Sequence, residues 1–217
     1  MTFAGCGATS AASGGGTAPN TPATYKITVA GDSISVGLGA SIRGVEGDHA
    51  VVKVIGVEGT GLARPDTFDW PARLQQLARE FPPQVLVFSL SSNDAQDLLD
   101  VQGKVVARLS DTAAWDAEYE RRLGASFDAF ASTGTTVVWV GHVRTAQDRV
   151  GLVNRRVQKL AAATAASRPF VVVADLADLL GTGEQKADRC LIADGLHLTV
   201  ACLDEAATKL LPTLAPR

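Results

Sequence analysis

The sequence predicts an α/β domain of three layers, α/β/α, with a parallel five-stranded sheet in the middle. Three observations support this prediction. Short β-type runs alternate with helical stretches from residue 25 onward, as in parallel α/β sheets. The 217 residues are enough for one domain with a real core and too few for two. Neither an internal repeat nor a domain break interrupts residues 25–217, so we expect a single domain there.

Five short β-type runs predict the strands. In chain order they are Lys26–Ala30, Ala50–Ile55, Gln84–Leu90, Thr135–Val140 and Pro169–Ala174. A sheet of this kind binds its ligands in the crevice beyond the carboxyl ends of its strands. Residues that directly follow a strand are therefore the first candidates for a functional site.

Helical stretches separate the strands and close the chain. They are Ser35–Arg43, Trp70–Glu80, Trp115–Ser132, Arg149–Ser167, Leu176–Leu180 and Val200–Leu211. In the third of them, apolar side chains recur every four residues from Trp115 through Tyr119 and Leu123 to Phe127, which is one face of an amphipathic helix. We interpret this aromatic row as packing against the sheet, not as a ligand site.

The first 24 residues differ in composition from the rest. Residues 7–24 are almost entirely small or turn-forming, which predicts a flexible linker. Just before them, Phe3–Cys6 resembles the lipobox of bacterial lipoproteins, in which the Cys is lipidated, although the charged and apolar parts of a signal peptide are missing. We expect an exported or cell-envelope protein. A plain disordered start on a cytoplasmic protein is the alternative.

Cys190 and Cys202 are the two remaining cysteines, and they flank the segment Asp194–His197. A disulfide between them would staple that segment and would imply an oxidising compartment. The alternative is a pair of small buried thiols.

Charge and composition exclude several classes of partner. The net charge is −3, and no block of like charge marks a surface for nucleic acid or membrane. The longest apolar runs fall far short of the ~20 residues of a transmembrane helix, so we expect no membrane-spanning segment. The three His and three Cys have no metal-ligand spacing, and no phosphate-binding Gly pattern follows the first strand. We therefore expect small-molecule substrates and no resident metal or cofactor.

Ser33 follows the first predicted strand in Gly31-Asp32-Ser33 and precedes a helix. A serine there is well placed for nucleophilic attack, and the partial positive charge of the helix N-terminus lies behind its own N–H. A simple helix cap is the alternative.

Two further motifs offer groups for an oxyanion. In Gly56–Leu62, the amide of Gly59 can approach a substrate oxygen without an intervening side chain, and Gly61 could take its place. After the third strand, the carboxamide of Asn93 is a suitable oxyanion donor. Each motif alone could also be an ordinary turn.

The fourth motif is Asp194-Gly195-Leu196-His197, before the last helix. A carboxylate can hold an imidazole in the tautomer that deprotonates a serine, so Asp194 and His197 are the candidate acid and base. A capping histidine is the alternative.

These four motifs, in this order and spacing, resemble the four blocks of the SGNH (GDSL) hydrolases and acyltransferases over residues 25–212. The resemblance implies the flavodoxin-like SGNH fold. It also implies a triad of Ser33, His197 and Asp194, with an oxyanion hole from the amides of Ser33 and Gly59 and the Asn93 side chain. The third block of the family usually reads Gly-x-Asn-Asp, and here Ser91 stands where the Gly would be, which could alter the loop backbone.

The family chemistry proceeds through an acyl-Ser33 intermediate that water or an acceptor hydroxyl resolves. The segments Gly59–Pro71, Ser92–Asp97 and Trp139–Arg144 resemble a bacterial SGNH subfamily associated with the cell envelope and with carbohydrate O-acylation. Within it, Val29–Gly39 and Gly141–Thr145 resemble actinobacterial octanoyltransferases. Those enzymes acylate glucosylglycerate-type precursors of methylglucose lipopolysaccharide from acyl-CoA. The resemblance implies an O-acyltransferase that moves a short or medium chain, such as octanoyl, onto a saccharide hydroxyl. A cell-envelope carbohydrate or lipid esterase is the alternative, and a binding module without turnover is the third hypothesis.

Four residues near the predicted catalytic edge are candidates for substrate binding. The guanidinium of Arg64 or Arg144 could pair with a glycerate carboxylate or with CoA phosphates, and His142 lies in the same group of loops. Trp70 could offer a face for sugar stacking. The alternatives are solvated surface arginines, and a Trp70 that simply packs under the loop before Pro71.

Overall fold

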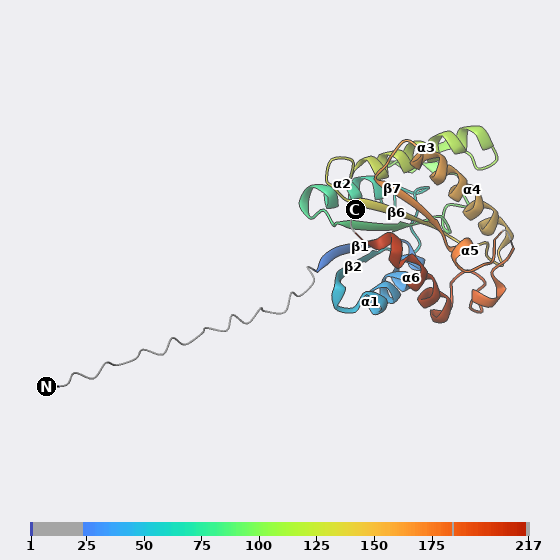
Figure 1. Ribbon diagram of the computed structural model, residues 1–217. Helices are drawn as coiled ribbons and strands as arrows, with labels where there is room; N and C mark the ends of the chain where they lie inside the picture. Colours follow the sequence, from blue (N-terminus) through green and yellow to red (C-terminus); the bar gives the residue numbers. More distant parts are fainter. Residues whose placement is uncertain (2–23, 184, 216–217) are drawn as a thin grey trace.

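The computed structural model describes Met1 and residues 24–183 and 185–215, and over this range it has the predicted three layers (Figure 1). The central sheet is parallel, with strand order β2-β1-β3-β6-β7. All five predicted strands are confirmed, with ends that shift by one or two residues. They are β1 (Tyr25–Gly31), β2 (Ala50–Gly56), β3 (Val85–Ser89), β6 (Thr136–Gly141) and β7 (Val171–Asp175). Residues 7–23 of the predicted linker and the Cys6 motif lie outside the described residues.

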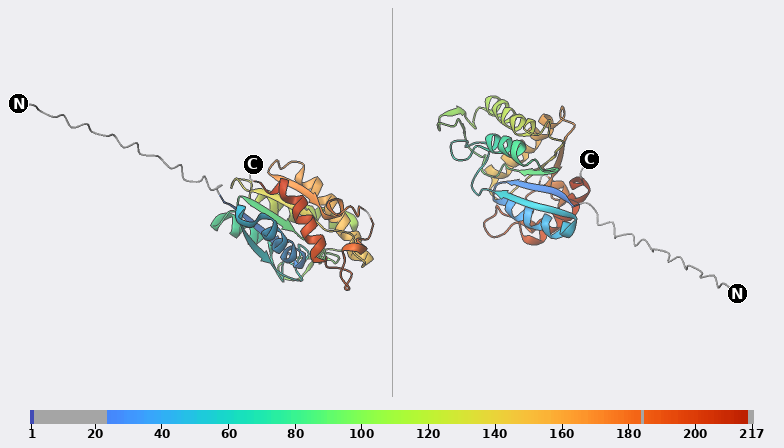
Figure 2. Two further views of the ribbon diagram at one scale, coloured as in Figure 1. Left: turned by 60° about the horizontal axis from the view of Figure 1, so that its bottom comes forward. Right: turned by 90° about the vertical axis from the view of Figure 1, so that its left-hand side faces the viewer.

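The helices divide between the two faces of the sheet, as the side view in Figure 2 shows. They are α1 (Ser33–Glu46), α2 (Trp70–Glu80), α3 (Thr112–Asp128), α4 (Asp148–Ala165), α5 (Leu176–Leu179) and α6 (Val200–Leu214). Side chains of α1, α5 and α6 form one apolar core with the sheet, and those of α2, α3 and α4 form the other. The predicted three-layer class is therefore confirmed.

Strand β3 lies at the centre of the sheet and feeds both cores. Val85 and Val87 belong to the core under α1 and α6, whereas Leu86 and Phe88 belong to the core under α2, α3 and α4. This division follows from the alternation of side chains along a strand. A strand that is buried on both faces reads as a continuous apolar run, which is why the sequence pattern identified it.

The aromatic row of α3 packs as the sequence predicts. Trp115, Tyr119, Leu123 and Phe127 are fully buried, and the Trp115 and Tyr119 rings stack with centroids 4.6 Å apart. Burying large aromatic side chains is among the strongest contributions to a core, about 25 cal/mol for each Å² removed from water. The row therefore fastens α3 to the sheet and to α2.

Short elements complete the fold. An antiparallel hairpin of β4 (Leu98–Leu99) and β5 (Val105–Ala107) follows the third motif, and two 3-10 helices are η1 (Gly47–His49) and η2 (Asp188–Cys190). Strands of two and three residues are too short to leave a periodic signal in the sequence. Among the described residues, the helices are all too short or too polar to cross a membrane.

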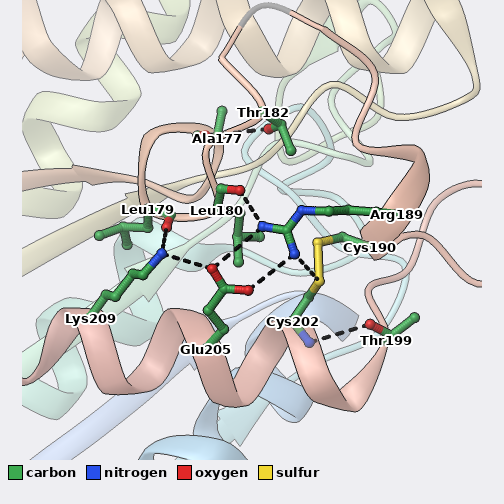
Figure 3. The surroundings of a disulfide bond; sticks show 10 residues. All are labelled: Ala177, Leu179, Leu180, Thr182, Arg189, Cys190, Thr199, Cys202, Glu205 and Lys209. Carbon is green, nitrogen blue, oxygen red and sulfur yellow. Dashed lines mark hydrogen bonds and ion pairs between the residues drawn. A yellow bond between two sulfur atoms is a disulfide. The ribbon is translucent and has the colours of Figure 1, made fainter.

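Cys190 and Cys202 form a disulfide, so the first of the two alternatives for these residues holds (Figure 3). The bond joins η2 to α6 across a separation of 12 residues, and the Asp194–His197 segment lies within the loop that it closes. Beside it, Arg189 donates a hydrogen bond to Glu205 at 3.1 Å, and Lys209 donates one to the same carboxylate at 2.7 Å. The loop is thus attached to α6 by a covalent bond and by an ion pair.

Candidate active site

The candidate site lies where the strand order of the sheet reverses. Strand β1 is hydrogen-bonded to β2 on one side and to β3 on the other, so the connections leave it in opposite directions. Open α/β sheets form their ligand crevice at such a point, beyond the carboxyl ends of the strands. The chain passes from β1 through Asp32 directly to Ser33, the first residue of α1, at this edge.

The structure brings Ser33, His197 and Asp194 together, although the first two lie 164 positions apart in the sequence. The Ser33 Oγ lies 2.8 Å from Nε2 of His197, and the other ring nitrogen, Nδ1, lies 2.6 Å from Oδ2 of Asp194. Ser33 and His197 are partly buried, whereas Asp194 is exposed. A serine, an imidazole and a carboxylate in this chain of contacts have the geometry of a nucleophile, a general base and an orienting acid.

The Asp194 carboxylate is ionised and its two oxygens have separate partners. Oδ1 accepts hydrogen bonds from the backbone N–H groups of Leu196 and His197, at 2.8 and 3.0 Å, and Oδ2 faces the imidazole. The His197 side chain, followed by these two N–H groups, lowers the pKa of Asp194 to about 2. An anion beside Nδ1 favours a proton on that nitrogen, which leaves the lone pair of Nε2 facing the Ser33 hydroxyl.

Gly195 allows the loop that carries this pair to turn tightly. Its φ is +68°, and a Cβ at this position would lie 2.7 Å from the Cβ of Ala146. The Gly195 carbonyl also accepts a hydrogen bond of 2.9 Å from the Ala146 N–H. The close approach of the two backbones holds the Asp194–His197 segment against the chain that follows β6. A side chain at position 195 would prevent this approach.

Two of the predicted oxyanion donors come from neighbouring loops. The Asn93 amide nitrogen donates a hydrogen bond of 2.9 Å to the Thr60 carbonyl, so Asn93 lies beside the loop of Gly59. Gly59 has a φ of +72° and open space around the position of a Cβ, whereas a Cβ on Gly61 would meet Asp94 at 2.1 Å. Gly61 is therefore enclosed, which favours Gly59 of the two glycines. The Ser33 amide belongs to the first turn of α1, where N–H groups have no partner within the helix.

Two buried carboxyl groups beside the site were not singled out in the sequence. Burial raises the pKa of Asp32 to about 8, and its Oδ1 caps α1 by accepting the Ile34 N–H at 3.0 Å. Burial also raises the pKa of Asp94, whose two oxygens accept hydrogen bonds from Tyr119 and from the Ala63 N–H, at 2.6 and 2.7 Å. These acids hold the motif loops in place. The sequence signal that could have identified these two acids is their position within the motifs Gly-Asp-Ser and Asn-Asp.

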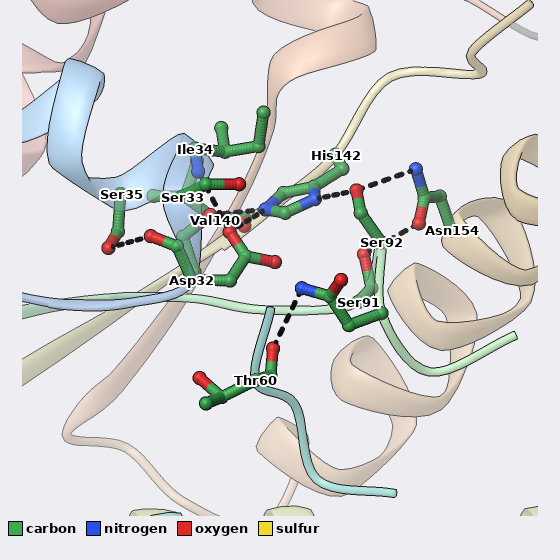
Figure 4. Close-up of polar contacts among 12 residues, drawn as sticks. Asp32, Ser33, Ile34, Ser35, Thr60, Ser91, Ser92, Val140, His142 and Asn154 are labelled. Carbon is green, nitrogen blue, oxygen red and sulfur yellow. Dashed lines mark hydrogen bonds and ion pairs between the residues drawn. The ribbon is translucent and has the colours of Figure 1, made fainter. Parts of the chain in front are cut away.

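His142 does not face the crevice, so the expectation that it binds substrate is wrong. Its side chain is buried, and Nε2 lies 2.8 Å from the Ser89 Oγ. On the other side of the ring, Nδ1 lies 2.7 Å from the Ser92 Oγ (Figure 4). Burial, with the nearby charge of His197, lowers the pKa of His142 to about 3. The ring is neutral near pH 7, and both of its nitrogens already have partners. Its role must be internal to the protein.

Trp70 is also buried, and the packing alternative holds for it. No part of the residue is exposed, its ring packs against Phe68 and Phe88, and its Nε1 donates a hydrogen bond of 3.0 Å to the Thr60 Oγ1. The indole therefore lies in the core and exposes no surface to solvent in this structure. Through its hydrogen bond to Thr60, Trp70 supports the loop that carries Gly59.

The two arginines keep partial exposure. The Arg64 side chain is 39% exposed and forms two hydrogen bonds with Asp66, at 2.9 and 2.7 Å. The Arg144 side chain is 30% exposed and lies 3.9 Å from Asp148. Both guanidinium groups are within reach of solvent, but each already faces a carboxylate. Their role in substrate binding stays a prediction.

A cavity of about 410 Å³ lies between α2, α3 and the β4–β5 hairpin. Leu62, Phe68 and Trp70 are among the residues that line it, and Ser33, His197 and Asp194 are not. The cavity therefore adds no group to the chain of contacts around Ser33.

Comparisons with known proteins agree with this fold. A family model described as "Protein of unknown function (DUF459)" matches residues 26–209. No curated protein matches the sequence.

Among solved structures, a member of the lipolytic G-D-S-L family from Veillonella parvula is 17% identical, with a TM-score of 0.62 over 86% of this chain and 96% of that one. A catalytic mutant of the acetylxylan esterase Axe2 from Geobacillus stearothermophilus is 14% identical, with a TM-score of 0.62 over 90% and 96%. The catalytic domain of the peptidoglycan O-acetyltransferase OatA from Streptococcus pneumoniae is 10% identical, with a TM-score of 0.60 over 89% and 93%. This chain has the SGNH hydrolase fold that the four motifs predicted.

Proposed function

The chain belongs to the family described as "Protein of unknown function (DUF459)", and we propose that it is a serine-dependent acyl-transfer enzyme. One observation carries this proposal. Ser33, His197 and Asp194 form a continuous chain of contacts of 2.8 and 2.6 Å at the ligand-binding edge of an SGNH hydrolase fold. The contact directions suit proton removal from the serine, because Asp194 is an anion and the Nε2 lone pair faces the hydroxyl.

In the first half of the proposed reaction, the Ser33 Oγ attacks the carbonyl carbon of an acyl donor while His197 Nε2 takes the hydroxyl proton. The negative charge that develops on the carbonyl oxygen is stabilised by the amides of Ser33 and Gly59 and by the Asn93 side chain. A carboxamide has two N–H donors, and Asn93 uses one of them on Thr60, so the second remains for the oxyanion. His197 then gives its proton to the leaving group, and acyl-Ser33 remains.

In the second half, His197 removes a proton from an acceptor hydroxyl or from water, and that oxygen attacks acyl-Ser33. The acyl group leaves with the acceptor, and the Ser33 oxygen recovers the proton from His197. Asp194 stabilises the imidazolium in both halves, since its pKa of about 2 keeps it charged. The acceptor decides between transferase and esterase, according to how well the site positions it and excludes water.

The proposed acceptor is a saccharide hydroxyl. Support comes from two structures of the same fold whose names state that one is an acetylxylan esterase and the other a peptidoglycan O-acetyltransferase. On the sequence resemblance, the donor is a short or medium acyl-CoA, such as octanoyl-CoA, and the acceptor is of the glucosylglycerate type. The alternative is an esterase that removes acyl groups from a glycan or lipid of the cell envelope.

The disulfide supports a place for the enzyme in an oxidising compartment, such as the cell envelope. Acyl-CoA is a cytosolic donor, so an envelope enzyme would use a different acyl donor. Donor identity and location are thus one question, and a donor series addresses both.

The decisive experiment offers purified protein acyl-CoA and p-nitrophenyl esters of several chain lengths, with and without glucosylglycerate or glucose. Mass spectrometry identifies the products. Ser33→Ala should lower turnover by at least about 10³-fold, whereas the control Ser132→Ala, at an exposed site, should not change it. Acylated saccharide that forms faster than free acid establishes the transferase. Free acid alone, whatever acceptor is present, establishes the esterase.

Arg64 and Arg144 are the proposed contacts for an acidic acceptor or for CoA phosphates. Ala substitution of either should raise the KM of glucosylglycerate or of acyl-CoA and leave the hydrolysis of neutral p-nitrophenyl esters unchanged. Unchanged KM values for both charged substrates would remove these residues from the site.

A further inference from the structure

A buried polar cluster lies directly behind the proposed oxyanion loop. It consists of Ser89, Ser91, Ser92, His142 and Asn154, and we call it the His142 cluster. All five side chains are buried, none with more than 7% of the residue exposed. They come from the end of β3, the loop that follows it, the chain after β6, and α4. Figure 4 labels Ser91, Ser92, His142 and Asn154. Asn93, the proposed donor to the oxyanion, directly follows Ser92.

One direction of the hydrogen bonds around His142 gives every group in this set of contacts a partner. Ser89 donates its single hydroxyl proton to the Val140 carbonyl at 2.9 Å, so it can only accept from His142. In this arrangement Nε2 of His142 carries the proton of the neutral ring. Nδ1 is then the acceptor, and the Ser92 hydroxyl donates its proton to it at 2.7 Å.

Asn154 continues this arrangement from α4. Its amide nitrogen donates to the Val143 carbonyl at 3.0 Å and to the Ser92 Oγ at 3.4 Å, and its oxygen accepts from the Ser91 hydroxyl at 3.0 Å. Both serines that precede Asn93 are thus held by the same carboxamide. Ser92 is held from a second side as well, by the imidazole.

The cluster carries no charge near pH 7. Nε2 of His142 lies 3.9 Å from the Asp32 Oδ1, which would be an ion pair if both groups were charged. However, burial raises the pKa of Asp32 to about 8 and lowers that of His142 to about 3, so both are neutral. A neutral ring keeps one nitrogen as an acceptor, which a charged ring could not do. The direction of the hydrogen bond from Ser92 to His142 depends on this neutrality.

Ser91 shows why the loop needs such support. Its φ is +156°, a backbone conformation that residues other than glycine rarely adopt. Ser91 also stands where the related motif has Gly. Non-glycine residues persist in such regions only when their surroundings hold them. The bond from the Ser91 hydroxyl to Asn154 is the contact that a glycine could not make.

We propose that His142 and Asn154 are positioning residues, which act through Ser91 and Ser92 to place the Asn93 amide against the oxyanion of the reaction at Ser33. The inference rests on the proposed acyl-transfer function, because it concerns the same site. Oxyanion donors act by being oriented in advance, and the loss of one donor typically costs about 10²–10³-fold in kcat. A displaced donor should cost less than an absent one.

Two substitutions of His142 separate the two sides of the ring. His142→Asn keeps an acceptor near the position of Nδ1, and His142→Gln keeps a donor near the position of Nε2. If the bond to Ser92 positions the loop, His142→Gln should lower kcat about 10- to 100-fold with an unchanged KM. His142→Asn should stay within about threefold of the wild type, because it still accepts from Ser92.

Ser92→Ala removes the same contact by a smaller change and should reproduce the kcat of His142→Gln. The double variant should be no slower than either single variant, because both changes break one contact. Additive losses, or equal losses in the Asn and Gln variants, would overturn the inference. Ser92→Ala keeps the test decisive if the Gln variant does not fold.

A readout that packing alone would not move is the affinity for an alkyl boronic acid. Its tetrahedral adduct with Ser33 places an oxygen in the oxyanion hole, so affinity should fall in parallel with kcat across the variants. A lower Tm with unchanged kcat and boronate affinity would assign the cluster a structural role only. Ser33→Ala separates the two proposals. If it leaves turnover intact, the proposed function fails, and if it abolishes turnover while His142→Gln stays at wild-type kcat, only this inference fails.

Discussion

Ser41 on α1 donates a hydrogen bond of 2.6 Å to the carboxylate of Asp204 on α6. The two helices pack so closely that a Cβ on Gly37 would lie 2.7 Å from the Leu203 side chain. Helix α1 begins with Ser33, and α6 begins three residues after His197. The contact therefore joins the helix that begins with the proposed nucleophile to the helix that follows the proposed base.

Asp194→Asn should lower kcat by about 10²–10⁴-fold, because a neutral amide no longer favours the proton on Nδ1 of His197 or stabilises the imidazolium. Turnover of a p-nitrophenyl ester at saturating concentration measures the loss. Asp188→Asn is the control, since Asp188 is an exposed acid of the same disulfide-bonded region. Equal rates for the two variants would remove Asp194 from the triad.

The raised pKa of Asp32 predicts a pH dependence of stability. With a pKa of about 8 in the folded protein, against an ordinary value of 3.8, the folded state binds the extra proton between these limits. Stability from this group is full below about pH 4 and falls as the pH rises toward about 8, by up to about 1.4 kcal/mol per pH unit. Urea unfolding should therefore show that the unfolding free energy of the wild type, relative to that of Asp32→Asn, decreases as the pH rises. His142 contributes the opposite slope, but both proteins contain it. A constant difference would mean that Asp32 is ionised in the folded state.

Arg122 and Arg121 are neighbours that should differ greatly in their effect on stability. Arg122 is 6% exposed in its side chain and donates to the Leu62 and Leu99 carbonyls and to Glu118. Arg121 is 67% exposed and pairs with the same Glu118. Arg122→Met should lower the free energy of unfolding by about 2–4 kcal/mol, because buried carbonyls lose their donor, and Arg121→Met by less than about 0.5 kcal/mol. Chemical denaturation measures both, and similar values would contradict the assignment.

Loss of the Cys190–Cys202 bond should destabilise the protein and its site together. For a loop closed across 12 residues, the expected loss is about 3 kcal/mol in unfolding free energy. Turnover of Cys190→Ala/Cys202→Ala should fall as well, since the Asp194–His197 segment lies within the loop. Thiol titration in a Cys6→Ser background checks the bond itself, with no reactive thiol before reduction and two after it. Two thiols before reduction would show that the bond is absent.

Gly31 and Gly44 should respond to alanine in opposite directions. A Cβ on Gly31 would lie 1.9 Å from the Ser89 carbonyl oxygen, and its φ is +145°. Gly44 lies in α1 with open space around it. Gly31→Ala should therefore separate β1 from β3 and lower both Tm and turnover, whereas Gly44→Ala should stabilise the helix by about 0.5–1 kcal/mol. A neutral Gly31→Ala would contradict the close approach of the strands.

The sequence predicted the parts of the fold that depend on local pattern. Strands buried on both faces are continuous apolar runs, so β3 could be located within one residue at each end. Ser33 and His197 could be chosen because acyl-transfer chemistry needs few side-chain types and they occur in recognisable motifs at strand ends. The β4–β5 hairpin was missed because such short strands leave no period.

The burial of individual side chains near the site could not be predicted from local pattern. Trp70 and His142 lie next to motif loops, and the sequence placed both at the edge of the sheet. Whether a side chain there faces solvent depends on what other elements cover it. Phe88 of β3 contacts the Trp70 ring, and His142 contacts Ser89 at the end of β3 and Ser92 in the loop that follows. These partners come from distant segments, so burial of the two side chains follows only from the assembled fold.

The sequence separation of 164 between Ser33 and His197 also determines when activity can begin during synthesis. A ribosome adds about 5–20 residues each second, so the nucleophile emerges many seconds before its base exists. No partly synthesised chain can cleave an ester by this mechanism, however well its first strands have folded. The same order makes the enzyme suitable for division into two inactive fragments. If the chain is cut at the exposed turn of the β4–β5 hairpin, one fragment holds the serine and the other holds the imidazole, and turnover would report their reunion.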